Sequence, residues 1–256
     1  MLTEERYTII LDYLRQRKTV TISELTKRLK TSESTVRRDI TLLAERGKLR
    51  KIRGGAAALS TSVFTTSEND MVFKYAQYDK EKKMIGAFAA TLIKPDDFIF
   101  IDAGTTTEAL IDALTPTKAS FVTNGLLHAK KLSKKGFSVM VLPGRVRHET
   151  EAIVGTQTLE MLKQYHFTCG FFGTNGIDPE VGFTTPNPEE ASVKRKAMAR
   201  CKDAYVLADS SKFNRVTPVE FAALKDAQII TERIVDSQYQ EKTNILEVGN
   251  DLHGHV

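Results

Sequence analysis

Residues that could bind DNA are concentrated near the N-terminus of this chain. Arginine can form two hydrogen bonds to guanine, serine and threonine can reach bases or phosphates, and basic residues on a turn can bind phosphate or enter the minor groove. The run Ser32-Glu33-Ser34-Thr35-Val36-Arg37-Arg38-Asp39 is followed by a basic glycine pair, Arg53-Gly54-Gly55. The residues predicted to contact double-stranded DNA are Ser34, Thr35, Arg37, Arg38, Lys51, Arg53 and Gly54.

A second group of polar residues follows apolar segments further along the chain. Glycine allows close backbone approach, and threonine hydroxyls, free amides and a helix N-terminus together suit a phosphate. Each run alone is also typical of an ordinary turn, but several runs at one sheet edge predict a shared small-molecule site. The runs are Asp102-Ala103-Gly104-Thr105-Thr106-Thr107, Thr123-Asn124-Gly125, Gly173-Thr174-Asn175-Gly176 and Asp209-Ser210-Ser211-Lys212.

Three helices and a wing are expected to position the DNA-binding residues. Apolar periodicity predicts helices over residues 4–17, 21–30 and 32–46, the second opened by a capping box at Thr21 and the third capped by Ser32. The connection between the last two is short, which is typical of a helix-turn-helix, and Gly47 is expected to stop the third helix. Alternating apolar and basic residues over 49–53 predict a strand that Gly54-Gly55 turns back as a wing.

The charge distribution favours nucleic acid as a partner of the N-terminal part alone. Residues 1–60 hold 14 Lys and Arg against 7 Asp and Glu, whereas the rest of the 256-residue chain holds 23 against 25. A solvated basic surface without a partner would give the same balance. Cys169 and Cys201 are too few for a disulfide framework and lack metal-ligand spacing, so we expect reduced core thiols and no metal site.

The domain organisation follows from composition and periodicity. A stretch rich in Ala, Ser and Thr predicts a linker over residues 59–72, between a DNA-binding domain of residues 1–58 and a second domain of residues 73–256. Helical and strand patterns alternate in the second domain, which predicts a mostly parallel α/β sheet. Helices are expected over 82–92, 106–114, 126–134, 158–163 and 189–201, and strands over 98–101, 121–122, 138–142, 169–172 and 204–208, with edges at 229–230 and 245–248.

In such a sheet, ligands bind beyond the carboxyl ends of the strands, where the polar runs lie. Arg145 and Arg147 follow another strand end, and arginine suits anionic groups, although an ion pair at the surface explains Arg145 equally well. The residues predicted to bind the effector are Lys82, Asp102, Gly104, Thr105, Thr106, Thr123, Asn124, Gly125, Arg145, Gly173, Thr174, Asn175, Glu190, Lys194 and Lys212.

Residues 3–58 resemble the winged helix-turn-helix of the DeoR-type bacterial transcription regulators. The resemblance rests on the run from Ser34 to Ile40, then Leu42, Gly47 and the Gly54-Gly55-Ala56 wing. It implies that the third helix reads an operator. The opening Met1-Leu2-Thr3-Glu4-Glu5-Arg6 and the recognition run Ser32-Glu33-Ser34-Thr35 look most like the fructose-operon repressors of the family, which implies fructose 1-phosphate as inducer. Tagatose 6-phosphate, glycerol 3-phosphate and deoxyribose 5-phosphate remain alternatives, since relatives answer to them.

Residues 75–235 resemble the sensor domain of the same family, which is similar in turn to ribose-5-phosphate isomerase. The resemblance rests on Lys82-Lys83 before Ile85-Gly86, on the run that begins at Asp102, and on Ala208 to Lys212. It implies that Lys82, Thr105, Thr106 and Lys212 hold phosphate. Where the isomerase carries its catalytic carboxylates, this chain has Phe172, Asn175 and, by spacing, Lys194. Because isomerisation needs a carboxylate base, binding without turnover is expected, with no catalytic residue.

The sequence therefore predicts a transcriptional repressor of a sugar-utilisation operon, released from its operator by a phosphorylated sugar. Two alternatives stay open: a phosphosugar isomerase with a DNA-binding appendage, and a nucleotide-binding regulator, although neither a Gly-x-Gly-x-x-Gly fingerprint nor a Walker lysine motif is present. We expect a homo-oligomer, dimer or tetramer, without a cofactor. Because no signal peptide or transmembrane run is visible, we expect a cytoplasmic protein without a membrane partner.

Overall fold

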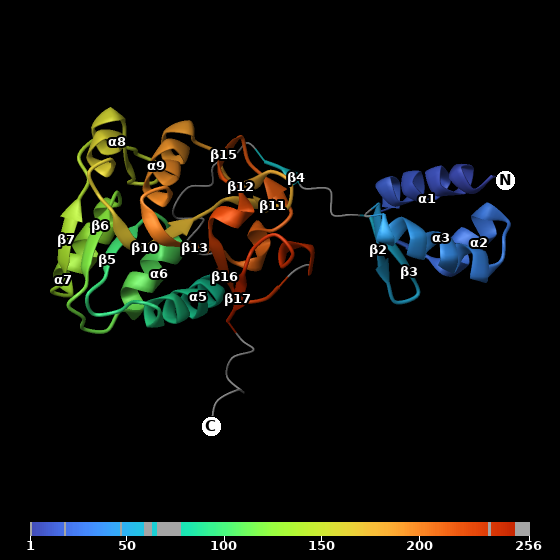
Figure 1. Cartoon of the computed structure of the whole chain (residues 1–256), viewed down its shortest axis with the longest axis horizontal. Helices are drawn as coiled ribbons and strands as arrows, with labels where there is room; N and C mark the ends of the chain where they lie inside the picture. The colour runs from blue at the N-terminus through green and yellow to red at the C-terminus, as the bar shows by residue number, and fades with distance from the viewer. Residues whose placement is uncertain are drawn as a thin grey trace, which may run out of the picture. The chain divides into compact units, whose positions relative to one another are not determined.

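The chain forms two compact units, Met1–Thr61 and Ser62–Val256 (Figure 1). The computed structural model describes residues 2–17, 19–46, 48–58, 63–65, 78–234 and 237–248. The helix stop expected at Gly47 lies outside the described residues.

The first unit consists of three helices and a small antiparallel sheet, as the sequence predicts. Its capping box is confirmed: the Thr21 hydroxyl accepts from Glu24 N at 3.2 Å, and Glu24 Oε2 accepts from Thr21 N at 2.8 Å. The sheet has the order β1-β3-β2, and the strand β1 was not predicted. The elements are α1 (Thr3–Arg17), β1 (Thr19–Thr21), α2 (Ile22–Leu29), α3 (Glu33–Glu45), β2 (Leu49–Ile52) and β3 (Gly55–Ala58).

The wing is the β2–β3 hairpin, and both of its glycines are required by geometry. Gly54 has a φ of +83°, a backbone conformation that is energetically unfavourable for any residue with a side chain. A Cβ on Gly55 would collide with the carbonyl oxygen of Val20 on the neighbouring strand β1. Side chains at these two positions would therefore distort the hairpin.

The second unit is built on a seven-stranded sheet with the order β17-β16-β13-β10-β5-β6-β7, in which every pair is parallel. The predicted α/β fold is confirmed. Strand order reverses at β5, which has β6 on one side and β10 on the other. The strands are β5 (Phe98–Ile101), β6 (Ser120–Thr123), β7 (Ser138–Val141), β10 (Phe167–Gly173), β13 (Cys201–Leu207), β16 (Gln228–Thr231) and β17 (Ile245–Glu247).

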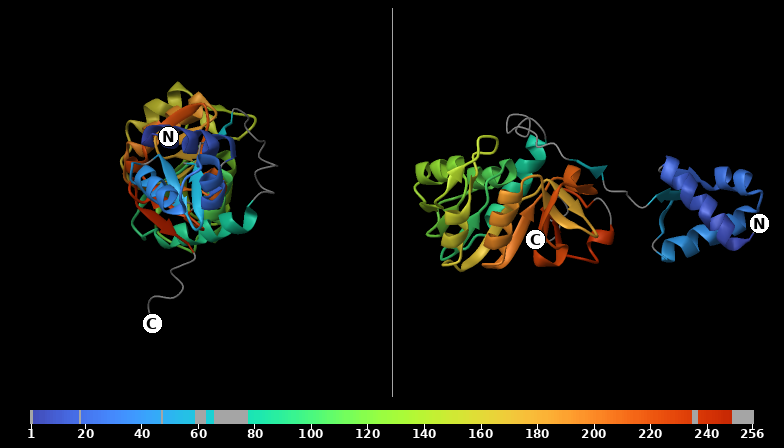
Figure 2. Two further views of the ribbon diagram at one scale, coloured as in Figure 1. Left: turned by 90° about the vertical axis from the view of Figure 1, so that its right-hand side faces the viewer. Right: turned by 90° about the horizontal axis from the view of Figure 1, so that it is seen from above.

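Helices pack on both faces of this sheet (Figure 2). Adjacent residues of one strand point to opposite faces, so Ile99 and Ile101 belong to one apolar cluster and Phe100 to the other. The first cluster includes residues of α5 (Asp79–Thr91), α6 (Thr105–Ala113) and α7 (Leu126–Lys134). The second includes residues of α8 (Thr156–Leu162) and α9 (Pro188–Met198).

Several short strands beside the main sheet were not predicted. Three form a small antiparallel sheet, β11 (Gly176–Asp178), β12 (Gly182–Thr185) and β15 (Val219–Ala222), and two form the hairpin β8 (Arg145–Val146) and β9 (Ile153–Val154). Strands of two to four residues are too short to show a reliable alternation in sequence. The remaining pair is β4 (Val63–Phe64) with β14 (Arg215–Val216).

Of the linker expected over residues 59–72, only residues 63–65 are described, and they include β4, whose carbonyl partners Asn214 and Val216 the local sequence does not reveal. One predicted helix end is wrong. The helix expected over residues 189–201 ends at Met198, because Cys201 already pairs with Phe167 as the first residue of β13. Cys169 and Cys201 are both free, and burial raises the pKa of the Cys169 thiol to about 12.

Replacing Gly86 with alanine should destabilise the second unit by about 1–3 kcal/mol, the usual cost of overpacking a core. Gly86 lies where α5 meets α6, and a Cβ there would stand 2.5 Å from Ala109 C and 2.6 Å from Leu110 N. Thermal or denaturant unfolding measures the loss. Ala87→Ser, at an exposed position of the same helix, is the control. Equal stability of the two variants would contradict the close approach of the helices.

Candidate DNA-binding and effector sites

The helix α3 buries one face and exposes another. Val36 and Ile40 lie in the core of the first unit, whereas Ser34, Arg37 and Arg38 are exposed. The Ser32 hydroxyl caps the helix by accepting from Thr35 N at 3.3 Å, and it lies 2.9 Å from the hydroxyls of both Ser34 and Thr35. Three hydroxyls and two guanidinium groups are thus available at or near the exposed face of one helix.

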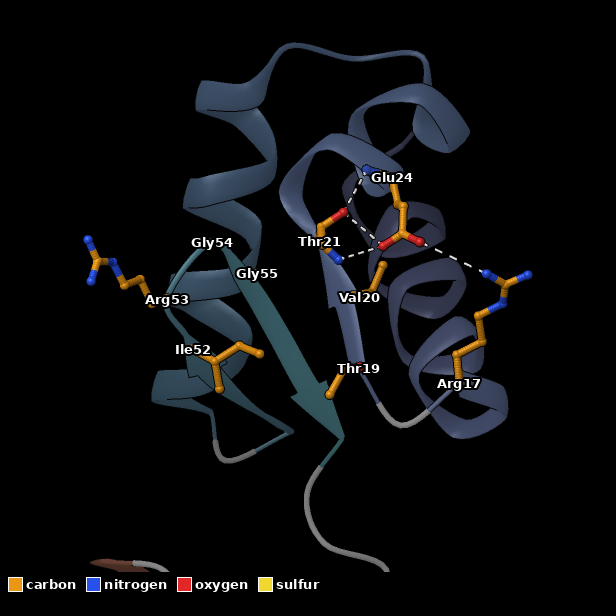
Figure 3. Close-up of a pocket in the computed structure, with 9 residues that line it drawn as sticks. All are labelled: Arg17, Thr19, Val20, Thr21, Glu24, Ile52, Arg53, Gly54 and Gly55. Carbon is orange, nitrogen blue, oxygen red and sulfur yellow. Dashed lines mark hydrogen bonds and ion pairs between the residues drawn. The ribbon is translucent and has the colours of Figure 1, made fainter.

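The wing adds exposed basic groups. Lys51, Arg53 and Gly54 are exposed, and Lys51 Nζ donates to Thr41 Oγ1 at 3.0 Å, which links β2 to α3. A hollow lies between the wing and the start of α2, and Arg17 and Glu24 on its wall form an ion pair of 3.9 Å (Figure 3). The Arg53 side chain points away from this pair (Figure 3), so it remains available to a ligand outside the unit.

An ion pair that sequence reasoning missed holds α1 to α3. Arg6 donates to both carboxylate oxygens of Asp39, from Nε at 2.7 Å and from Nη2 at 3.0 Å, and Asp39 is buried. Asp39 lies one helical turn after Val36, on the apolar side of α3. A charged residue on that side was the one feature of the sequence that could have indicated a buried ion pair. This pair fixes the helix whose other face carries Arg37 and Arg38.

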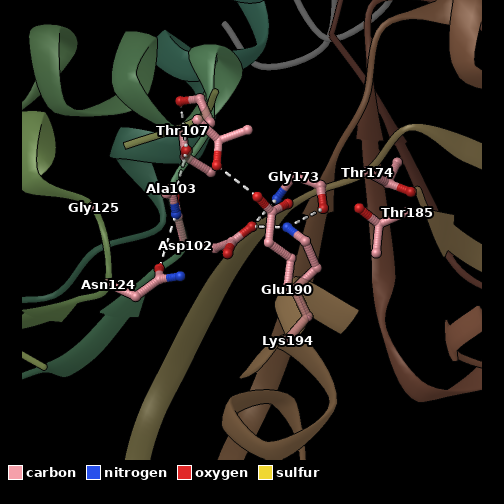
Figure 4. Close-up of polar contacts among 12 residues, drawn as sticks. Asp102, Ala103, Thr107, Asn124, Gly125, Gly173, Thr174, Thr185, Glu190 and Lys194 are labelled. Atoms are coloured by element: carbon pink, nitrogen blue, oxygen red, sulfur yellow. Dashed lines mark hydrogen bonds and ion pairs between the residues drawn. The ribbon is translucent and has the colours of Figure 1, made fainter. Parts of the chain in front are cut away.

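Three of the predicted effector residues, Asp102, Gly173 and Lys194, meet at the point where strand order reverses in the sheet. Asp102 follows β5, and Gly173 ends β10. Lys194 of α9 forms a buried ion pair with Asp102 and donates to Gly173 O at 3.1 Å, while Gly173 N donates to Asp102 Oδ2 at 3.1 Å (Figure 4). Such a reversal leaves a crevice at the carboxyl ends of the strands, where ligands of parallel α/β sheets bind.

Burial decides the electrostatics of this cluster. Desolvation raises the pKa of the Asp102 carboxyl above its ordinary value, whereas the Lys194 ammonium and the Gly173 N–H act in the opposite direction. Two opposite charges that leave water together are stable only with good geometry and further hydrogen bonds. Asp102 and Lys194 each have such an additional bond, and both go to Gly173.

A second set of contacts fixes the backbone after β5. Asn124 Oδ1 accepts from Ala103 N at 3.0 Å, and His128 Nε2 lies 3.0 Å from Thr107 Oγ1 and 3.3 Å from Gly104 N. Burial lowers the pKa of His128 to about 4, so the ring is neutral near pH 7. Sequence reasoning assigned no role to His128 and placed Thr107 only in the polar run expected to suit a phosphate, whereas both side chains bond to the loop itself.

Several other predicted effector residues form hydrogen bonds within the loops that follow the strands. Thr123 Oγ1 donates to Ile101 O at 2.6 Å and accepts from Gly125 N at 3.0 Å. Thr185 Oγ1 donates to Asn175 Oδ1 at 3.2 Å, and Thr174 Oγ1 lies 3.0 Å from Thr184 O. Gly104 is the N-cap of α6, and Thr105 and Thr106 form its first turn.

The two predicted arginines have different surroundings. Arg145 forms an ion pair of 2.5 Å with Glu189, and both side chains are exposed, as expected for a surface pair. Arg147 is buried and lies 2.6 Å from Glu190, whose Oε1 also accepts from Thr150 Oγ1 at 2.6 Å. Glu190 and Lys194 are one turn apart on α9, so Arg147 is the arginine associated with the buried cluster.

The two lysines predicted to hold phosphate occupy separate elements. Lys82 is buried in α5, and Lys212 ends the short turn Ser210–Lys212 after β13. Lys212 Nζ is 3.6 Å from Asp209 Oδ2 and 3.3 Å from Ser211 Oγ, and its side chain is 23% exposed. Lys212 is therefore accessible enough to exchange these local partners for an anion.

In the part of the chain that the structure describes, no helix is both long and apolar enough to cross a bilayer. No group of three or more His, Cys, Asp or Glu side chains among those residues is placed to hold a metal ion.

The fold and the two sites define a class: a transcription regulator with a winged helix-turn-helix unit and a parallel α/β sensor unit. The DeoR-like helix-turn-helix domain matches residues 6–62, and the DeoR C terminal sensor domain matches residues 77–233. The chain belongs to the DeoR family of transcriptional regulators, as its sequence predicts.

Two full-length relatives carry regulator names. The uncharacterized HTH-type transcriptional regulator FruR of Bacillus subtilis (strain 168) is 44% identical over 247 residues, which cover 95% of this chain and 97% of that protein. The lactose phosphotransferase system repressor of Streptococcus mutans is 33% identical, over 98% of this chain and 100% of that protein. A solved ribose 5-phosphate isomerase A from Neisseria gonorrhoeae aligns with 54% of each chain, at 15% identity and a TM-score of 0.39.

Proposed function

We propose that this protein represses a sugar-utilisation operon and leaves its operator when a phosphorylated sugar binds the second unit. The observation that carries the proposal is the presence in one chain of an exposed Arg37-Arg38 pair on α3 and the buried Asp102–Lys194 cluster at the strand-order reversal. The names of the two relatives support a sugar-responsive repressor. We place its action in the cytoplasm, on double-stranded operator DNA, as a dimer or tetramer and without a cofactor.

We infer that residues 1–58 bind DNA and that sensing begins at β4 rather than at residue 73, because β4 pairs with β14 of the second unit. Fructose 1-phosphate is the proposed effector. Its support is the resemblance of the opening and recognition runs to fructose-operon repressors. Phosphate would be held by Lys82, Lys212 and the start of α6, and the sugar by residues around Asp102 and Lys194.

Replacing Lys212 with alanine should leave operator binding intact and make the protein much less sensitive to the inducer. Losing a hydrogen bond to a charged group costs about 1.5–3 kcal/mol, so release should need about 10- to 100-fold more fructose 1-phosphate. Titrations of the protein–operator complex with fructose 1-phosphate measure this shift. Lys225→Ala removes an exposed lysine elsewhere in the unit and is the control. Normal release of the Lys212 variant would show that the phosphate site is misplaced.

An isomerase would need a different arrangement of the Asp102–Lys194 cluster. Moving a proton next to a carbonyl needs a carboxylate that is free to accept it. The Asp102 carboxylate instead bonds to Lys194 and to Gly173 N, and Phe172 and Asn175 offer no base. We therefore propose binding without turnover. Steady conversion of ribose 5-phosphate by the purified protein, abolished by Lys212→Ala, would favour the enzyme instead.

A further inference from the structure

The strand β4 connects the segment that leaves the first unit to the loop that carries Lys212. In the sequence, only residues 59–62 lie between the end of β3 and the start of β4. β4 pairs in parallel with β14, with Val63 opposite Arg215 and Phe64 opposite Val216. Val63 N donates to Asn214 O at 2.9 Å, and Thr65 N donates to Val216 O at 3.0 Å. Movement of the chain just after Lys212 would therefore act directly on β4.

Main-chain hydrogen bonds, rather than buried side chains, hold β4 in place. The Val63 and Phe64 side chains are 58% and 63% exposed, although both are large and apolar. Little apolar area is removed from water at this strand, so its attachment depends on its main-chain hydrogen bonds to residues 214–216 and on the geometry of their acceptors. A strand held in this way can detach at low cost in free energy.

Tyr239 sets the geometry of the first acceptor, Asn214. The Tyr239 side chain is fully buried, and its hydroxyl accepts from Asn214 N at 3.0 Å. The same hydroxyl lies 2.9 Å from Asn214 Oδ1 and 3.2 Å from Ile177 O. Asn214 has a φ of +56°, in the left-handed region that asparagine tolerates better than most residues. The Tyr239 hydroxyl thus fixes a strained turn whose carbonyl receives the first N–H of β4.

The same residues are bonded to the effector loops. The Tyr239 ring meets the ring of Phe213, the neighbour of Lys212, edge to face, at 5.0 Å and 87°. Phe213 in turn bridges to Ile177 of β11, just beyond the predicted Gly173-Thr174-Asn175 loop. Thr217 N donates to Thr184 Oγ1 at 3.0 Å. β4, the Lys212 turn and the loop after β10 are therefore connected through these contacts. Figure 1 shows β4 beside β11 and β12.

We propose that Tyr239 is a positioning residue that couples effector binding at Lys212 to the DNA-binding unit, by holding Asn214 and through it the strand β4. The proposal rests on the proposed function of the Lys212 site. An effector that binds one arrangement of the Lys212–Asn214 turn more tightly shifts the population toward that arrangement. β4 then carries the shift to the chain segment that precedes it.

The first arm of the test needs no effector and uses Tyr239→Phe in the full-length protein, which removes the hydroxyl and keeps the ring. Loss of the hydroxyl that holds Asn214 should speed amide hydrogen exchange at Val63 and Thr65 by about five- to tenfold, with no change at Ile229 in the sheet. Tyr205→Phe, which alters another aromatic residue of the same unit, is the control. Unchanged exchange at Val63 and Thr65 in the Tyr239 variant would overturn the inference, whatever the effector.

The second arm measures coupling as the ratio of operator Kd values with and without fructose 1-phosphate. The wild-type ratio should fall in the usual range of about 5- to 150-fold, and the Tyr239→Phe ratio should be near 1. Both the operator Kd without effector and the calorimetric Kd for fructose 1-phosphate should stay within about twofold of wild type, because Tyr239 contacts neither ligand. A wild-type ratio in the variant would overturn the inference. Failure of fructose 1-phosphate to release the wild-type protein would count against the proposed effector, and the exchange result would then decide the role of Tyr239.

Discussion

Replacing Arg38 with alanine should reduce affinity for operator DNA by about 10- to 100-fold, because a good contact between arginine and a base contributes about 1–3 kcal/mol of discrimination. Arg38 is exposed on α3, on the side away from the buried Val36 and Ile40, so the fold should not change. Arg37→Ala should have a similar effect, since the exposed pair of Arg37 with Glu33 at 3.4 Å is weak and easily exchanged for DNA. Binding isotherms with operator and random DNA at one salt concentration measure the change.

Lys51→Ala separates base contacts from phosphate contacts. A lysine that binds only phosphate should contribute equally to operator and random DNA, and its loss should lower the slope of log K against log salt by about 1. Arg38→Ala should instead reduce the ratio of the affinity for operator DNA to the affinity for random DNA. Lys27→Ala, at an exposed position of α2, serves as the matched charge control. Unchanged operator affinity in both arginine variants would exclude α3 as the recognition helix.

Replacing Lys194 with methionine should destabilise the second unit by about 3–5 kcal/mol, the usual result of leaving one buried partner of an ion pair uncompensated. Both side chains are almost fully buried, so solvent cannot take over the role of the ammonium. The double variant Asp102→Asn/Lys194→Met should recover most of the loss, because it removes both charges of this pair and leaves neither uncompensated. Neither variant should respond to the inducer. Denaturant unfolding of the two variants checks the expectation, and a single variant as stable as wild type would contradict it.

The single variant should also acquire a characteristic pH dependence. Burial already raises the pKa of Asp102 in the folded protein, and removal of the Lys194 ammonium leaves that effect unopposed by this cation. A folded-state pKa above the unfolded value means that the folded state binds the proton more tightly. Stability should therefore be greatest below the ordinary carboxyl pKa and fall as pH rises through the raised value. Unfolding midpoints of the variant across this range, compared with the double variant, measure the effect.

Local patterns in the sequence were sufficient to predict the main helices and strands. The Thr21 and Ser32 caps, the apolar stripe of α3 and the continuous apolar strands β5 and β10 are decided by near neighbours in the chain, and all are present. Contacts between distant residues could not be predicted in this way. The Arg6–Asp39 pair, the placement of Lys194 against Asp102 and the pairing of β4 with β14 depend on tertiary packing, which a single sequence does not display.

The predicted effector residues illustrate the same limit. Their position at strand ends follows from the α/β pattern. Asp102, Gly173 and Lys194 do lie in one hydrogen-bonded cluster, and Asn124 bonds to the adjacent Ala103 N. The residues predicted from the sequence include Arg145 and not Arg147, since nothing local indicates which of two nearby arginines turns inward. In the folded chain, the region of the β8–β9 hairpin leaves Arg145 exposed and buries Arg147 against Glu190.

One titration shows whether this chain joins operator binding to phosphosugar sensing. The purified protein is bound to DNA from its own upstream region, and the complex is titrated with fructose 1-phosphate, tagatose 6-phosphate, glycerol 3-phosphate, deoxyribose 5-phosphate and the unphosphorylated compounds. We predict release by one phosphorylated compound, fructose 1-phosphate first, and not by its unphosphorylated form. Tight binding to DNA that no phosphorylated compound alters would contradict the account of the second unit.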